Sequence, residues 1–259
     1  MALRGPSGAV HQADWLDFAR GLRPASVDLL YADPPFNTGK SRSTPPGAAK
    51  AGRTAREEYR DSWRTVRDYI DWLRERVVAT MPALKPTGNV LVHVDWRTSH
   101  HVRLMLDEVL GEDRFVNHLI WSYGLGGSSP RRFARKHDDI LFYCVDPGRY
   151  YFEAPMVAST SRMMAGKPKK ATDVLAIASI NNQAKERCGY PTQKPLELLS
   201  MLVGACCPAG GTVLDPCCGS GTTLVAAMEQ GRNWLGCDIS AGAVRIANGR
   251  LEGGRGNIG

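Results

Sequence analysis

The residues best suited to chemistry in this sequence form a short turn, Asp33-Pro34-Pro35-Phe36. Methylating an exocyclic amine of a nucleobase is difficult, because the nitrogen lone pair is delocalised into the ring. The Asp33 carboxylate and the Pro34 carbonyl could accept the amino hydrogens and localise that lone pair, while Phe36 stacks on a base rotated out of a duplex. The prolines stiffen this turn. The competing interpretation is a rigid Asp-Pro-Pro turn without chemistry.

A second group of residues has the composition of a cofactor turn. Residues 212–223 predict a buried strand, a tight turn at Gly219-Ser220-Gly221 and the start of a helix. Asp238 follows at about the spacing of a ribose-binding carboxylate. Asp215, just before the turn, repels a pyrophosphate but suits an amino-acid ammonium. The pattern favours an adenosyl ligand with an amino-acid end, and the alternative is a plain strand-to-helix turn with a surface Asp.

The elements that must position these turns predict an α/β fold. Short apolar runs alternate with helical spacing, which is typical of a parallel sheet with helices on its faces. The expected strands are residues 27–31, 89–94, 212–214 and 234–237. The expected helices are residues 69–78, 102–110, 196–206, 222–228 and 241–251.

The remaining segments are less regular. Residues 119–123 and 140–145 predict two strands around a connection rich in Gly, Ser and Arg, forming a hairpin outside the regular alternation of the main sheet. Residues 39–56 contain five basic residues and no acid, which predicts a mobile loop. Residues 159–170 are polar, without strong periodicity.

Composition narrows the class of protein. The formal net charge of +7 favours an acidic partner such as nucleic acid. The start of the chain lacks a signal-peptide pattern, and no run of eighteen apolar residues predicts a membrane span. Seven cysteines occur without a Cys-x-x-Cys pair, so we expect a reduced, cytoplasmic protein with no metal site.

A third segment, Tyr190-Pro191-Thr192-Gln193-Lys194-Pro195, completes a recognisable set. Together the three motifs resemble the beta group of bacterial DNA amino-methyltransferases, the N6-adenine and N4-cytosine enzymes of restriction-modification systems. The resemblance spans nearly the whole chain, and the catalytic turn precedes the cofactor turn as in that group. It implies a Rossmann-like, circularly rearranged, S-adenosylmethionine-dependent methyltransferase fold. It also implies a single domain over residues 1–259, with a target-recognition insertion at approximately 115–175.

The same resemblance implies roles for individual residues. S-adenosyl-L-methionine would contact Asp215 and its turn through its methionine end, Asp238 through its ribose, and Asp14 near its adenine ring. Asp33 would also hold the ammonium, and Lys194 would supply charge to the carboxylate. The implied cofactor-binding residues are Asp14, Ala32, Asp33, Thr192, Gln193, Lys194, Asp215, Pro216, Cys217, Cys218, Gly219, Ser220, Gly221, Thr222, Asp238 and Ile239. The family more often has Phe where Cys217 or Cys218 stands, which leaves a smaller and softer pocket wall here.

Double-stranded DNA is the partner that the resemblance implies. We expect Lys40, Arg42 and Arg53 of the loop after the catalytic turn to bind it, as well as Arg131, Arg132, Arg135 and Lys136 of the recognition region. The alternative interpretation of the residues in the recognition region is a basic turn that is exposed to solvent and binds nothing. Cytosine-N4 members usually begin the catalytic turn with Ser, so Asp33 favours adenine N6 as the target, with cytosine N4 as the alternative. Pairing into a homodimer is common in the family, and a cognate restriction endonuclease is the other implied protein partner.

Other classes of protein could account for some of these residues. Pro216-Cys217 matches the nucleophilic Pro-Cys of cytosine-C5 methyltransferases, but it belongs to the cofactor turn and would leave the Asp33 turn unexplained. A non-catalytic DNA-binding module on the same fold would not need intact Asp33 or Lys194. A methyltransferase for RNA or for a protein glutamine amide could use a similar turn, and the basic recognition segment favours duplex DNA.

Overall fold

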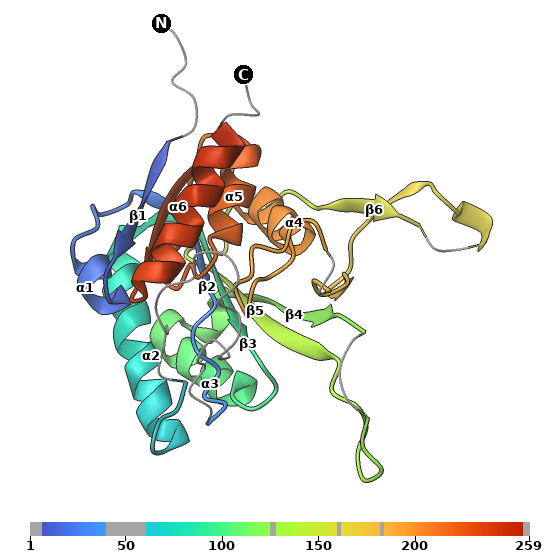
Figure 1. Ribbon diagram of the computed structural model, residues 1–259, viewed down its shortest axis with the longest axis horizontal. Coiled ribbons are helices and arrows are strands. Elements are labelled where there is room, and N and C mark those ends of the chain that lie inside the picture. The colour runs from blue at the N-terminus through green and yellow to red at the C-terminus, as the bar shows by residue number, and fades with distance from the viewer. Residues whose placement is uncertain (1–6, 40–60, 125–127, 160–161, 182–183, 256–259) are drawn as a thin grey trace, which may run out of the picture.

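The central element of the fold is an eight-stranded sheet in the order β1-β10-β9-β2-β3-β5-β4-β8. The computed structural model describes residues 7–39, 61–124, 128–159, 162–181 and 184–255. Helices cover both faces of this sheet, and two extensions project from one side of the molecule (Figure 1).

One half of the sheet is parallel, as the sequence predicted. Its strands are β1 (Gly8–Gln12), β10 (Asn233–Asp238), β9 (Thr212–Asp215), β2 (Val27–Ala32) and β3 (Leu84–Val94). β2 is buried at every position, which explains its apolar residues from Leu29 to Ala32, and its one acid, Asp28, is paired with Lys85. β1 was not expected: it is a five-residue edge strand with little burial, held by pairing with β10.

The other half corrects the prediction of a purely parallel sheet. β5 (His137–Cys144) pairs antiparallel with both β3 and β4 (Phe115–Ser122), and β8 (Val174–Ala176) pairs parallel with β4. The expected hairpin of β4 and β5 therefore forms, but it lies within the main sheet. Its reversed strand interrupts the parallel order.

Alternate residues of β2 point to opposite faces of the sheet and enter two cores. Leu29 and Tyr31 pack with α4 (Leu196–Cys206), α5 (Thr222–Glu229) and α6 (Ala241–Arg255). Leu30 and Ala32 pack on the other face with α1 (Trp15–Arg20), α2 (Val66–Thr80) and α3 (Ser99–Leu110). The five expected helices are all present, and α1 is an additional short one.

The residues between β5 and β8 form the upper of the two extensions in Figure 1. Antiparallel strands β6 (Met156–Ala158) and β7 (Pro168–Lys170) flank the short 3-10 turn η3 (Arg162–Met164), so the polar stretch expected at residues 159–170 contributes the second strand of a hairpin. Two further 3-10 turns, η1 (Met81–Ala83) and η2 (Glu112–Arg114), precede β3 and β4. None of the helices in the described ranges has the length and apolar character needed to span a membrane.

Candidate active site

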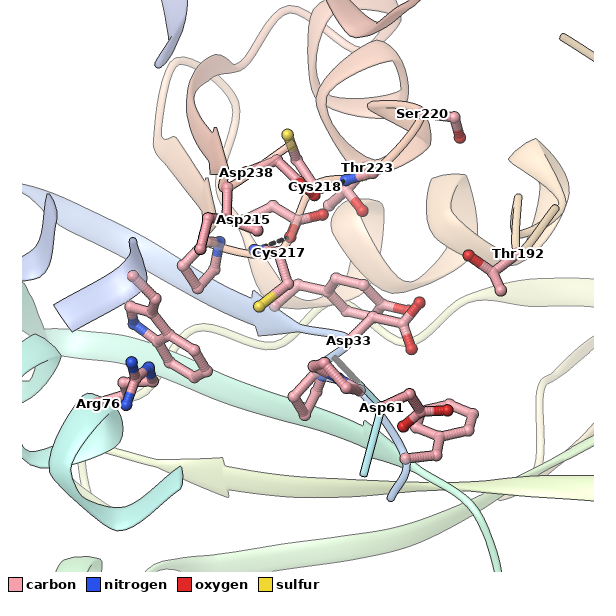
Figure 2. Close-up of a pocket in the computed structure, with 18 of the residues that line it drawn as sticks. Asp33, Asp61, Arg76, Thr192, Asp215, Cys217, Cys218, Ser220, Thr223 and Asp238 are labelled. Carbon is pink, nitrogen blue, oxygen red and sulfur yellow. Dashed lines mark hydrogen bonds between the residues drawn. The ribbon is translucent and has the colours of Figure 1, made fainter. Parts of the chain in front are cut away.

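A cavity of about 240 Å³ opens at the carboxyl ends of the parallel strands (Figure 2). Asp33 follows β2, Asp215 ends β9 and Asp238 ends β10, so the three carboxylates meet at one edge of the sheet. This is the edge where open α/β sheets bind ligands. The catalytic and cofactor turns, 182 residues apart from Asp33 to Asp215 in the numbering, thus share one cavity.

The glycine turn brings backbone close to its neighbours. Gly221 has φ +74°, and a Cβ added there would lie 2.8 Å from the Cβ of Ala247 on α6. Gly219 has φ +49°, and an added Cβ would lie 2.9 Å from the Tyr190 ring. The Gly219 N–H donates to the Asp238 carboxylate at 2.9 Å, so the turn fixes the acid that follows β10. Both positions therefore need glycine: a side chain at Gly219 would press on the cavity wall at Tyr190, and one at Gly221 would press on α6.

Asp215 is deeply buried in the cavity wall, at 2% exposure. Burial raises its pKa to about 7, and the negative charge of Asp33 contributes, while hydrogen bonds from Thr223 and the Cys217 N–H oppose the shift. A cationic ligand group beside this carboxylate would stabilise its charged form. The site therefore prefers a ligand with a positive charge at this point.

Asp33 is tied to a motif 161 residues away. The Lys194 Nζ donates to the Asp33 Oδ2 at 2.6 Å and lies 5.0 Å from the centre of the Phe36 ring. Both members of this ion pair are mostly buried. The pair therefore holds the carboxylate of the catalytic turn against the strand edge, next to an aromatic surface.

Behind Phe36 lies a buried hydrogen-bond chain that no motif indicated. The fully buried His93 ring accepts or donates to the Tyr31 hydroxyl at 2.8 Å through Nδ1, and contacts Asp138 at 3.3 Å through Nε2. Its centre lies 5.9 Å from that of Phe36. Burial alone would raise the pKa of Asp138, but the His93 hydrogen bond and charge, with the charge of Lys194, hold it below its ordinary value. The chain connects the catalytic turn to the beginning of β5.

Three thiols surround the glycine turn. Cys217 and Cys218 line the cavity, and the Cys237 thiol donates to the Pro216 carbonyl at 3.3 Å. Burial is the largest cause that raises the pKa of each of the three, and nearby carboxylates add to it. All three thiols are therefore held in the protonated form at neutral pH.

Most of the residues expected at the site line this cavity. They are Asp14, Asp33, Pro34, Pro35, Phe36, Thr192, Lys194, Asp215, Pro216, Cys217, Cys218, Gly219, Ser220, Thr222, Asp238 and Ile239. Three do not: Ala32 is fully buried in β2, Gly221 packs against α6, and the Gln193 amide bonds to Cys188 and Glu186 in its own loop. Tyr190, from the same motif as Gln193, lines the cavity instead.

An aromatic wall near Asp14 was missed. Trp15, Trp63 and Trp72 line the cavity there, and Arg76 of α2 donates to both carboxylate oxygens of Asp14, at 3.0 and 2.8 Å. Asp14 also caps α1 by accepting from the Leu16 N–H. These contacts fix Asp14 as part of the wall. The remaining unexpected lining residues are Ala13, Tyr31, Asp61 and Thr223.

A second cleft lies between the turn after β3 and the loop from β4 to β5. It is lined by Asp95, Trp96, Arg97, Tyr123, Ser128, Ser129, Arg132, Ala134, Arg135 and Asp138. Asp138 belongs to the hydrogen-bond chain behind Phe36, so this chain runs from the second cleft to a residue that lines the first cavity. Of the expected DNA-binding residues, Arg132 and Arg135 line this cleft and Arg131 and Lys136 flank them. Lys40, Arg42 and Arg53 lie outside the described residues.

The sheet order, the single reversed strand β5 and the cavity at the strand ends define a Rossmann-like methyltransferase fold. The M1.HpyAVI-SAM complex matches it with a TM-score of 0.67 at 20% identity, over 94% of this chain and 98% of that chain. PvuII DNA methyltransferase (cytosine-N4-specific) matches with a TM-score of 0.71 at 15% identity, over 95% of this chain and 87% of that chain.

The family follows from the sequence comparison. The model of the DNA methylase family matches residues 27–249, so the chain belongs to this family. Type II methyltransferase M.ScaI of Streptomyces caespitosus is 27% identical over 94% of this chain and 81% of its own length. DNA adenine methyltransferase YhdJ of Escherichia coli is 26% identical over 88% of this chain and 76% of its own length.

Proposed function

We propose that this DNA methylase transfers the methyl group of S-adenosyl-L-methionine to the exocyclic amine of a flipped base, and that the base is adenine, methylated at N6. The observation that carries the proposal is the shared cavity of the Asp33 turn and the glycine turn, with Asp33 held by Lys194. The DNA adenine methyltransferase YhdJ among the similar proteins supports the choice of base.

The residues of the cavity fit this cofactor. Asp215, whose pKa burial raises to about 7, suits the methionine ammonium, because a positive neighbour stabilises its charged form. Lys194 is the cation available to a carboxylate, and Asp238 lies at the strand end where a ribose is held. Trp15, Trp63 and Trp72 offer apolar surface to the adenine ring beside Asp14. When bound, the cofactor supplies an electrophilic methyl group on a sulfonium.

The catalytic turn prepares the attacking amine. The Asp33 carboxylate and the Pro34 carbonyl accept the two amino hydrogens, so the nitrogen lone pair points toward the methyl group. Phe36 stacks on the flipped base, and His93 supports its ring from behind at 5.9 Å between centres. Formation of the N–C bond would break the bond between the methyl carbon and the sulfonium sulfur, which would leave as a neutral thioether, and Asp33 is positioned to take the proton that the nitrogen would lose. Lys194 keeps the carboxylate in place throughout.

Cytosine N4 is the second candidate. The cytosine-N4-specific PvuII enzyme is among the structural matches, and the same acceptor pair would suit its substrate. Asp33 in place of the Ser usual in the cytosine enzymes is the residue that favours adenine. Residues at approximately 115–175, with their basic loop and β6–β7 hairpin, are proposed as the target-recognition region.

The test is to incubate the protein with unmethylated bacterial DNA and labelled S-adenosylmethionine and to identify the modified nucleoside by mass spectrometry. We expect N6-methyldeoxyadenosine, and a loss of at least about 100-fold in the Asp33→Ala variant, since one lost transition-state contact commonly costs this much. Folding of the variant is checked by its thermal unfolding. N4-methylcytosine would keep the mechanism and overturn the base. Label in RNA or protein but not in DNA would overturn the substrate, and an inactive protein that still binds DNA would indicate a non-catalytic module.

A further inference from the structure

The loop between β4 and β5 carries a large aromatic side chain in water. Phe133 is 98% exposed, the highest value among the large apolar side chains of the described residues. It lies in the lower extension in Figure 1, which projects beyond the carboxyl end of β4. Single exposed apolar side chains are common on protein surfaces, so the meaning of this exposure depends on the residues around Phe133.

The residues around Phe133 indicate the charge of that molecule. Arg131 and Arg132 precede it, and Arg135 and Lys136 follow it, while residues 124–137 contain no acid. A polyanion therefore fits this loop better than an apolar protein surface or a second copy of this basic chain. Among polyanions, DNA is the one that also offers flat apolar faces, in its base pairs.

The loop holds Phe133 outward from both sides. Arg132 before it and Ala134 after it line the second cleft, and the Arg135 guanidinium lies 3.2 Å from the centre of the Trp96 ring. Trp96 belongs to the turn after β3, so this contact anchors the loop to the body of the fold. The aromatic ring is thus presented by an anchored segment.

The position of the loop links it to the reaction. Asp138, in the wall of the second cleft, bonds to His93, whose ring also contacts the Phe36 ring of the catalytic turn. The base of the loop is therefore joined to the catalytic cavity through one buried side chain. A base that enters this cavity leaves a gap in the duplex, and proteins that distort DNA fill such gaps with apolar wedges.

We propose that Phe133 is this wedge: it enters the base stack as the target base leaves and occupies the vacated space. The inference rests on the proposed function, because it requires a duplex substrate with a flipped base. Arg131, Arg132 and Lys136 then lie where they can meet the phosphates on either side of the gap.

The test compares two DNA duplexes in single-turnover methylation assays. One is fully paired and carries the site mapped from methylated genomic DNA, and the other has an abasic residue opposite the target base, so that the base leaves its stack easily. We expect Phe133→Ala to slow methylation of the paired duplex at least about tenfold, as loss of an aromatic-base stack commonly does. On the abasic duplex its rate should return to within about twofold of the intact protein. Phe133→Trp should keep activity on both.

Leu104→Ala is the matched control, since Leu104 is a 62% exposed apolar residue of α3 that lines neither cavity. Equal slowing of Phe133→Ala on both duplexes, or no slowing on either, would overturn the wedge alone. An intact protein inactive on both duplexes would overturn the proposed function as well. A change in oligomeric size in Phe133→Ala with unchanged rates would assign the ring to a protein contact instead.

Discussion

Two regions at the edge of the sheet differ in how much of them is exposed. The carboxylates at the ends of β9 and β10 are enclosed by neighbouring backbone and side chains, whereas the loop that joins β4 and β5 projects beyond the sheet (Figure 1). In the first region Asp215 is 2% exposed and the two turn glycines pack against α6 and Tyr190. In the second region Phe133 is 98% exposed, with arginines on both sides. On the proposed function, the first region would bind a small cofactor of fixed shape, and the second would meet a large, charged polymer. Substitutions in the first should therefore alter stability and catalysis, and those in the second should alter DNA binding and base flipping while leaving stability unchanged.

The largest effect is expected for Lys194→Met, which tests whether the enclosed region supports catalysis. It removes the cation that bonds to Asp33 at 2.6 Å, so we expect single-turnover methylation to fall about 100-fold. The control is Lys85→Met, which breaks an equally close pair with Asp28 at 2.7 Å, outside both cavities. It should lower the free energy of unfolding while leaving the methylation rate of the folded protein near that of the intact chain. Equal losses of activity in both variants would contradict the role assigned to Lys194.

A pair of glycine substitutions measures how closely the cofactor turn is packed. Gly221 and Gly231 have nearly equal φ values, +74° and +71°, but only at Gly221 would an added Cβ meet another atom, at 2.8 Å. We expect Gly221→Ala to lower the free energy of unfolding by about 2–4 kcal/mol, from strain plus overpacking. Gly231→Ala should cost about 1–2 kcal/mol from strain alone. Urea unfolding gives both values, and equal costs would show that the turn is not closely packed.

The pH dependence of stability tests the burial of Asp215. Its folded-state pKa of about 7 lies above the roughly 3.9 of an unfolded Asp, so the folded protein holds an extra proton between these values. Its contribution to stability is full at pH 4 and is lost as the pH rises to 7, by at most about 1.4 kcal/mol per unit. Asp215→Asn should remove this part of the slope in urea unfolding from pH 4 to 8. Parallel slopes in the two proteins would contradict the shift.

The smallest expected effect belongs to the projecting loop. Arg131→Ala should weaken DNA binding about two- to threefold and reduce the slope of log affinity against log salt by about 0.9, the value for one phosphate contact. Thermal unfolding should not change, because the side chain lies on an exposed loop. Arg67→Ala on α2, whose side chain is 90% exposed, is the control with no expected effect on DNA binding. An equal change in both variants would show that Arg131 affects DNA binding only through the net charge of the protein and makes no local phosphate contact.

The sequence predicted the enclosed region better than the projecting one, and the reason is physical. β2 and β9 are buried strands next to turns of Pro and Gly, whose backbone preferences are local. The turns at residues 33–36 and 215–221 could therefore be predicted from their own residues. β1 carried little, because its five residues are held by pairing with β10, more than 200 residues away. The reversed direction of β5 depends likewise on a distant neighbour, β3, and not on its own residues.

The parts of the site that were missed come from long-range packing. Trp63 and Trp72 reach the cavity because α2 docks beside α1, and His93 reaches Asp138 because β3 pairs with β5. Within its own segment, none of these residues has a pattern that predicts a position near the cavity. Gln193 shows the opposite case: a motif named it, and its amide turns back to the loop at Glu186 and Cys188. A motif predicts the neighbourhood of a residue more securely than the direction of its side chain.

The three protonated thiols around the glycine turn also bear on how the enzyme survives between turnovers. A sulfonium methyl group is an alkylating agent, and a thiolate is the side chain most ready to react with it. Cys217 and Cys218 line the same cavity, which would expose the protein to methylation of its own chain. Burial keeps the pKa of both thiols well above their ordinary value, so the reactive form is scarce. On the proposed cofactor site, the burial that shapes the cavity wall thus also keeps these two thiols in their less reactive, protonated form.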